Sequence, residues 1–167
     1  MTSVRLRQGA VAVVLLGATL WVLAAAPAGA CFGARLRVGV PSAGAGALAG
    51  FAIGYYVEEK TGIEPEFVEL AGTPQQAIAE HAVDLVLAAE DVLPPAVAEV
   101  RMAGDVPGLG PARFWLHREV LDDLRFFTVE RALGRAGELF ASPAYAAAVA
   151  SEGAARQAAR QAVLRAE

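Results

Sequence analysis

Cysteine and histidine are scarce in this chain of 167 residues, and their scarcity excludes several kinds of site. Because Cys31 is the single cysteine, no internal disulfide can form, and the fold must be stabilised by packing. The two histidines, His81 and His117, belong to no Cys/His cluster in the sequence. This pattern argues against a structural zinc site, so we expect no metal centre.

Positive charge is also scarce once the first 30 residues are set aside. Two of the 14 basic residues and none of the 18 acidic residues lie there, which leaves a net charge of −6 on the remainder. An acidic domain argues against nucleic acid as a partner. The sequence also contains no arrangement of Ser, His and Asp, metal-ligand motif or Walker loop above chance. We therefore expect no catalysis and no cofactor.

The N-terminus has the pattern of an export signal. Arg5 and Arg7 precede an apolar run over 10–26, and the small residues Ala28, Gly29 and Ala30 follow it. A short basic region, an apolar region and an A-x-A cleavage site are typical of secretory signal peptides. The sequence thus predicts a signal peptide over 1–30 and one domain over 31–167 in the periplasm or another extracytoplasmic space.

Cys31 follows the cleavage site directly and permits a second interpretation. The segment over 28–31 resembles the lipobox of bacterial lipoproteins, with Ala28 where that motif usually has leucine. This resemblance implies lipidation of Cys31 and attachment to a membrane. A third interpretation is an uncleaved membrane anchor, because the apolar run is close to the shortest length that spans a bilayer.

The first half of the domain alternates strands and helices. The apolar pattern predicts strands over 36–40, 64–70 and 83–88, separated by helices over 47–60 and 74–81. Thr73 and Pro74 form a helix start, and Gly62 is a helix stop. Because neighbouring parallel strands need crossover connections, this order predicts an α/β domain with a parallel sheet and helices on its faces.

The second half is less regular. We expect a short strand or helix over 97–103, a linker over 104–111 that is rich in glycine and proline, and a strand over 112–117. A helix is predicted over 121–140, with Leu124, Phe127, Leu133 and Phe140 on its apolar face. Ser142 and Pro143 start a further helix, and the last helix spans 154–166.

Several of these segments resemble a known family. The similarity lies in the segments 36–40, 57–62, 72–73, 83–86, 114–121 and 140–145. Together they resemble the first lobe of type II periplasmic substrate-binding proteins, most closely the glycine betaine and quaternary amine receptors of ABC transporters. The resemblance implies a three-layer, mostly parallel sheet with helices on both faces. It also implies recognition of a small solute, such as a quaternary amine or an amino acid, and an ABC transporter permease as partner.

The chain departs from this family in one respect. Residues 90–111, between the third strand and the returning strand, are too few for the second lobe that closes over a ligand. A single lobe would bury little of a solute. The aromatic cage that often binds quaternary ammonium is also missing, because Tyr55, Tyr56, Phe126 and Phe127 lie at helix-packing positions.

Candidate binding residues follow the predicted strands at one edge of the sheet. Ser42 and Gly44 precede the first helix, and Thr73 and Gln75 begin the second. Free N–H groups at such positions favour an anion or a carbonyl oxygen, and ligands of open α/β sheets lie at this edge. Simple N-capping is the alternative role for Ser42 and Thr73.

Two acidic residues complete the candidate set. Glu90 and Asp91 follow the third strand and could bind a cation, or they could form a solvated acidic turn. The histidines receive no functional role. His81 is interpreted as a surface residue at a helix end, where it favours the helix dipole, and His117 as a polar residue at a strand end.

Two other functions remain open. Gly44, Gly46 and Ala49 match the G-x-G-x-x-G/A pattern of dinucleotide-binding enzymes, with Glu69 available for a ribose. The first glycine comes about two residues too late for that turn, and an exported protein has little access to NAD. The other alternative is an envelope interaction or assembly protein that lost its ligand and kept an exposed partner face.

Overall fold

The structure is a computed structural model that describes residues 35–89, 98–151 and 153–166. The predicted signal peptide, Cys31, Glu90 and Asp91 lie outside these residues. In chain order the elements are β1 (Arg35–Val40), α2 (Gly44–Thr61), β2 (Glu64–Glu69), α3 (Pro74–Ala79), β3 (Leu85–Ala88), β4 (Ala98–Val106), β5 (Gly110–His117), α4 (Arg118–Asp122), the 3-10 helix η1 (Leu124–Phe126), α5 (Phe127–Leu133), α6 (Ala136–Phe140), α7 (Pro143–Val149) and α8 (Ala155–Arg165).

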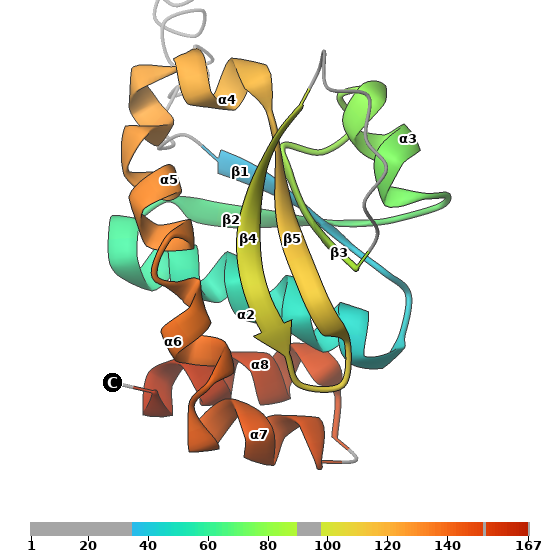
Figure 1. Ribbon diagram of the computed structural model, residues 1–167, viewed down its shortest axis with the longest axis vertical. Coiled ribbons are helices and arrows are strands. Elements are labelled where there is room, and N and C mark those ends of the chain that lie inside the picture. The colour runs from blue at the N-terminus through green and yellow to red at the C-terminus, as the bar shows by residue number, and fades with distance from the viewer. Residues whose placement is uncertain (1–34, 90–97, 152, 167) are drawn as a thin grey trace, which may run out of the picture. The chain divides into compact units, whose positions relative to one another are not determined.

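The strands form one open, mixed sheet in the order β2-β1-β3-β5-β4 (Figure 1). β1 pairs in parallel with β2 and with β3, as the alternation of strands and helices predicts. β5 pairs antiparallel with both β3 and β4. The expectation of an α/β domain is therefore confirmed, and the sheet is parallel only in its first half.

The prediction of a linker over 104–111 is wrong for most of this segment. Its first and last residues belong to β4 and β5, and only 107–109 connect the two strands. The glycines serve the hairpin rather than a flexible linker. Gly104 has a φ of +88° where the register of the pair shifts, and Gly108 and Gly110 each have a φ of +81°. These angles suit glycine because it has no Cβ.

Helix α2 is buried along most of its length because it packs between the sheet and other helices (Figure 1). It contacts β1, β2 and β3 on one side and α5 and α8 on another. Gly54 allows the close approach to β2, since a Cβ there would lie 2.4 Å from Cε1 of Phe67. Gly62 ends the helix at φ +73°, and its N–H donates to the carbonyl oxygen of Glu58, as predicted.

The alternation of side chains along β3 and β5 divides the apolar core in two. Leu85, Leu87, Phe114 and Leu116 join the core that contains α2 and the C-terminal helices. Val86, Ala88 and Trp115 point the other way and pack with Ile78 of α3. Helices therefore cover both sets of side chains, α2 on one and α3 on the other.

The single helix predicted over 121–140 is wrong, because the chain there forms separate short helices. Asp123 has an extended backbone, and its side chain accepts from the N–H of Arg125 to start η1. Leu133 and Phe140 are buried as expected, but Leu124 and Phe127 are 87% and 62% exposed. The breaks in the helix leave the second half of the predicted apolar face in the core and turn its first half to solvent.

The start of the following helix is as predicted. Ser142 caps α7 by accepting a hydrogen bond from the N–H of Tyr145, with Pro143 as the first helical residue. The last helix is also present as α8. None of the helices in the described ranges combines the length and the apolar character that crossing a bilayer requires.

Candidate functional site

Ser42 and Gly44, the predicted site residues near the start of α2, have different roles in the structure. Gly44 is the first residue of α2 and has a φ of +79°. Ser42 is exposed and does not cap the helix, since the N-cap residue is Ala43 and no side chain bonds there. The alternative N-capping role of Ser42 is therefore wrong.

The second pair of predicted residues lies at the start of α3. Thr73 Oγ1 accepts a hydrogen bond from the N–H of Gln76 at 3.2 Å, so its predicted capping role is confirmed. Gln75 is half-buried in the first turn. A hollow of about 220 Å³, which we call the α3 groove, lies beside this turn and is lined by 68–73, Gln76, Ala77, Glu80, Ala82 and Val83.

Gly44 and Thr73 line different hollows. Gly44 faces Leu48 and residues of α7 and α8 in one of about 290 Å³, whereas Thr73 lines the α3 groove. The residues of the dinucleotide-binding pattern are separated in the same way. Glu69 lines the α3 groove and not the hollow beside Gly44. Among the described residues, the predicted set therefore does not line one common hollow.

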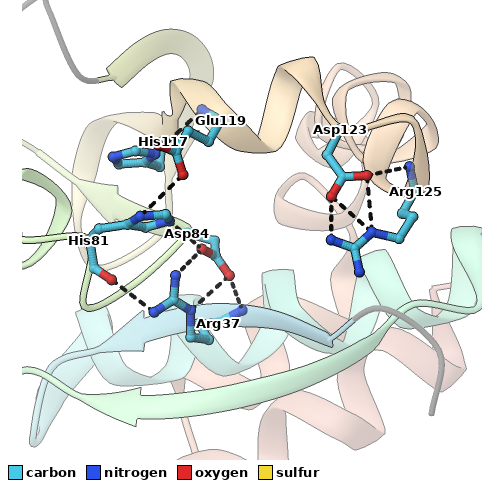
Figure 2. A network of polar contacts seen from close by, with 7 residues as sticks. All are labelled: Arg37, His81, Asp84, His117, Glu119, Asp123 and Arg125. Carbon is cyan, nitrogen blue, oxygen red and sulfur yellow. Dashed lines mark hydrogen bonds and ion pairs between the residues drawn. The ribbon is translucent and has the colours of Figure 1, made fainter.

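A dense network of polar side chains lies at the opposite, amino edge of the parallel strands (Figure 2). Its centre is Asp84, which precedes β3 and is only 5% exposed. The Asp84 carboxylate accepts from the backbone N–H of Arg37 at 2.8 Å, from Nε at 3.1 Å and from Nη2 at 2.6 Å. The hydrogen bond to Asp84 raises the pKa of Arg37, so this buried carboxylate is compensated by a fixed cation.

Arg37 extends the network to the end of α3. Its Nη1 donates to the backbone carbonyl oxygen of His81 at 2.8 Å. His81 has a φ of +54°, a left-handed conformation that histidine adopts more often than most residues with a Cβ. The His81 Nε2 lies 3.4 Å from Oδ1 of Asp84, so the same carboxylate orients this imidazole.

The imidazole rings of His81 and His117 are stacked. Their centroids are 3.8 Å apart and their planes differ by 2°. His117 ends β5, is 7% exposed, and accepts a hydrogen bond from the N–H of Glu119 at its Nδ1, at 3.4 Å. Glu119 Oε2 lies 3.4 Å from Nδ1 of His81. We call His81, His117 and Glu119 the His–Glu cluster.

The electrostatics of the stack favour a neutral His117. Burial lowers its pKa below the ordinary value of 6.5, and a positive charge on His81 lowers it further. A neutral imidazole retains one nitrogen lone pair that can accept a proton or bind a metal. The cluster thus brings two imidazoles and one carboxylate together, with one ligand atom from each within 4.8 Å of the others.

The sequence interpretation missed this cluster because it treated the two histidines separately. The sequence feature that could have revealed the cluster was the strand that returns to the sheet and pairs with the third strand. An antiparallel strand next to β3 ends where β3 begins, which places His117 at Asp84, and the N–H of His117 does donate to the carbonyl oxygen of Asp84 at 2.9 Å. Asp123 and Arg125, also drawn in Figure 2, form a separate ion pair across η1.

Comparison of the chain with family models, curated protein sequences and solved structures finds no match. The resemblance to periplasmic substrate-binding proteins therefore stays a prediction that depends on the sequence segments and on topology.

Proposed function

We propose that this chain is an exported domain that recognises a small solute for an ABC-type importer and performs no catalysis. In this proposal the fold is one lobe of a type II periplasmic binding protein, with helices on both faces of its sheet. The order of β1, α2, β2, α3 and β3, with parallel pairing of the three strands, supports the proposal. So does the returning strand β5, which lies antiparallel beside β3.

The observation that carries the proposal is the α3 groove. It begins where β2 ends, which is the edge at which open α/β sheets bind ligands. Val68, Leu70 and Val83 supply apolar lining, and the carboxylates of Glu69 and Glu80 add negative charge. Apolar lining with a few charged groups is typical of small-molecule sites. This chemistry suits a small organic cation, such as a quaternary amine or the ammonium end of an amino acid.

Thermal unfolding of the full chain against a panel of solutes tests the proposal. The panel contains quaternary amines, amino acids, sulfonates, phosphonates and oxyanions. A ligand at a hundred times its dissociation constant adds about 2.7 kcal/mol to the free energy of unfolding. We expect a shift with the cationic class and its loss in the double variant Glu69→Gln/Glu80→Gln.

Glu59→Gln is the matched control, because Glu59 is exposed on α2 and lies away from the α3 groove. It should keep the shift of the wild-type chain. No shift with any class, from a folded protein, would contradict solute capture by this chain. A shift that survives in the double variant would place the solute elsewhere.

The proposal includes export and a membrane attachment. Residues 1–30 act as the signal, and Cys31 carries a lipid that holds the domain near its transporter permease. Intact mass spectrometry of the protein from the membrane fraction tests this, since lipidation adds the mass of acyl chains to a chain that begins at Cys31. Cys31→Ser should leave the membrane fraction. Retention of that variant would favour an uncleaved anchor instead.

A ligand-free interaction or assembly protein is the second candidate. It is favoured by Leu124 and Phe127, two large apolar side chains that are strongly exposed on η1 and α5. Exposed apolar patches mark interaction surfaces. Sedimentation of the wild type and of Leu124→Ser/Phe127→Ser distinguishes this candidate, since an assembly that depends on this surface dissociates in the double variant.

A further inference from the structure

We propose that the His–Glu cluster binds a divalent transition-metal ion of the zinc class. His81, His117 and Glu119 supply two imidazole nitrogens and one carboxylate oxygen within 4.8 Å of one another. This ligand set suits Zn²⁺, which takes nitrogen and oxygen ligands and keeps a fourth position for water in sites with three protein ligands. The proposal goes beyond solute recognition and does not depend on it.

The polar contacts around the cluster favour a lone pair on the Nδ1 of each imidazole. Oδ1 of Asp84 lies 3.4 Å from Nε2 of His81 and favours the tautomer with its proton on that nitrogen. The lone pair of His81 is then on Nδ1, which lies 3.4 Å from Oε2 of Glu119. A carboxylate that orients a metal-binding histidine through its other nitrogen is a recurring feature of metal sites. Because Arg37 holds Asp84, the orientation of His81 depends on a buried and fixed group.

His117 presents its Nδ1 in the same way. This nitrogen accepts from the N–H of Glu119, so in the neutral ring it carries the lone pair. At 3.4 Å that hydrogen bond is long and weak, and a metal ion would replace it at little cost. The parallel stack holds the two rings 3.8 Å apart. Two imidazole nitrogens on one tetrahedral zinc lie about 3.3 Å apart for Zn–N bonds of about 2.0–2.1 Å. Because the lone pairs of stacked rings lie in parallel planes, the two rings must turn out of the stack until both lone pairs point at the ion.

The approach of Glu119 to His81 fits a shared metal ion. An unprotonated Nδ1 and a carboxylate oxygen repel each other at 3.4 Å, because both carry lone pairs. A metal ion relieves this repulsion by using all three lone pairs at once. The side chains of His81 and Glu119 are 36% and 74% exposed, so an ion can enter from solvent.

Calorimetric titration of the purified full chain with ZnCl₂ tests the site. We expect saturable binding of one Zn²⁺ per chain through this cluster. His81→Asn and Glu119→Gln should each weaken it at least about tenfold, because each removes one ligand. Glu119 is exposed and His81 is half-buried, and asparagine tolerates the left-handed backbone of position 81. Circular dichroism and thermal unfolding confirm that each variant folds.

Glu59→Gln serves again as the control and should bind zinc as the wild type does. Titration with Co²⁺ gives a second readout, since visible absorption bands of the bound ion should appear in the wild type and disappear in both cluster variants. Absence of saturable zinc binding in the folded wild type would overturn the proposal. So would binding that is unchanged in His81→Asn and Glu119→Gln, because the ion would then lie elsewhere in the chain.

Discussion

The two edges of the sheet differ in how their polar side chains are engaged. At the carboxyl edge, Ser42 is exposed and Thr73 bonds to the next turn of its own helix. At the amino edge, Arg37 bonds to Asp84 and to His81, which lie 47 and 44 residues further along the chain. The carboxyl edge thus satisfies its polar groups locally, while the amino edge joins β1, α3 and β3. Changes at the amino edge should therefore affect stability more.

The largest effect should come from Asp84→Asn, which tests whether the amino edge depends on a compensated charge. The substitution removes the carboxylate that accepts three hydrogen bonds from Arg37. We expect a loss of about 3 kcal/mol in the free energy of unfolding, at the low end for breaking a buried pair, because the Arg37 side chain is 33% exposed. Urea denaturation measures it.

Asp122→Asn is the control, because Asp122 is exposed at the end of α4. It should change stability by less than about 0.5 kcal/mol. If both variants unfold at the same urea concentration, the pair of Asp84 with Arg37 does not stabilise the amino edge.

The second largest effect on stability should come from Tyr145, a residue of the core that lies at neither edge of the sheet. Its side chain is fully buried, its hydroxyl has no hydrogen-bond partner among the described residues, and burial raises its pKa to about 12. The unfolded phenol ionises near pH 10, so stability is present below pH 10 and is lost as pH rises toward 12. The loss is about 2–3 kcal/mol at about 1.4 kcal/mol per pH unit.

Tyr145→Phe isolates this contribution, because phenylalanine does not ionise. Denaturation at pH 8 and at pH 11.5 should show a smaller loss in the variant than in the wild type. At pH 8 the variant should be at least as stable, since it removes a buried hydroxyl without a partner among the described residues. Equal losses in both proteins would show that other groups cause the alkaline unfolding.

The third effect tests the carboxyl edge itself. Thr73→Ala removes the N-cap of α3 and should cost about 1 kcal/mol. Thr73→Ser keeps a hydroxyl that can accept from Gln76 and should recover most of the loss. Thermal unfolding measures both. Failure of serine to restore stability would assign the effect to the lost methyl group rather than to the cap.

The smallest effect should come from Ser42→Ala at the same edge. Ser42 is exposed and makes no capping bond to α2. We expect a change within about 0.5 kcal/mol in the same measurement. A loss as large as that of Thr73→Ala would mean that the two helix starts are equivalent after all.

The elements of the first half were predictable from the sequence because local rules determine them. The apolar pattern indicated β1, α2, β2, α3 and β3, and the stop at Gly62 and the cap at Thr73 are residue chemistry. The second half was less predictable. A single extended residue, Asp123, interrupted a helical pattern, and glycines that suggested a linker instead supply the backbone angles of a hairpin.

The candidate site was predictable only in part, because its residues converge by strand pairing rather than by sequence motif. Thr73 lines a hollow at the expected edge. The His–Glu cluster required knowing that β5 lies beside β3, which brings His117 to Asp84 and so to His81. The distance between positions 81 and 117 along the sequence does not indicate that the two imidazoles stack.

By itself, the sequence determined the α/β class, the parallel pairing of the first three strands and the starts of α3 and α7, because propensity, alternation and capping act over a few residues. Only the tertiary structure decided that Gly44 and Thr73 line separate hollows and that the two histidines stack. The reason is that burial and register act between distant segments, and they place Asp84 between Arg37 and His81 whatever the local pattern of each segment.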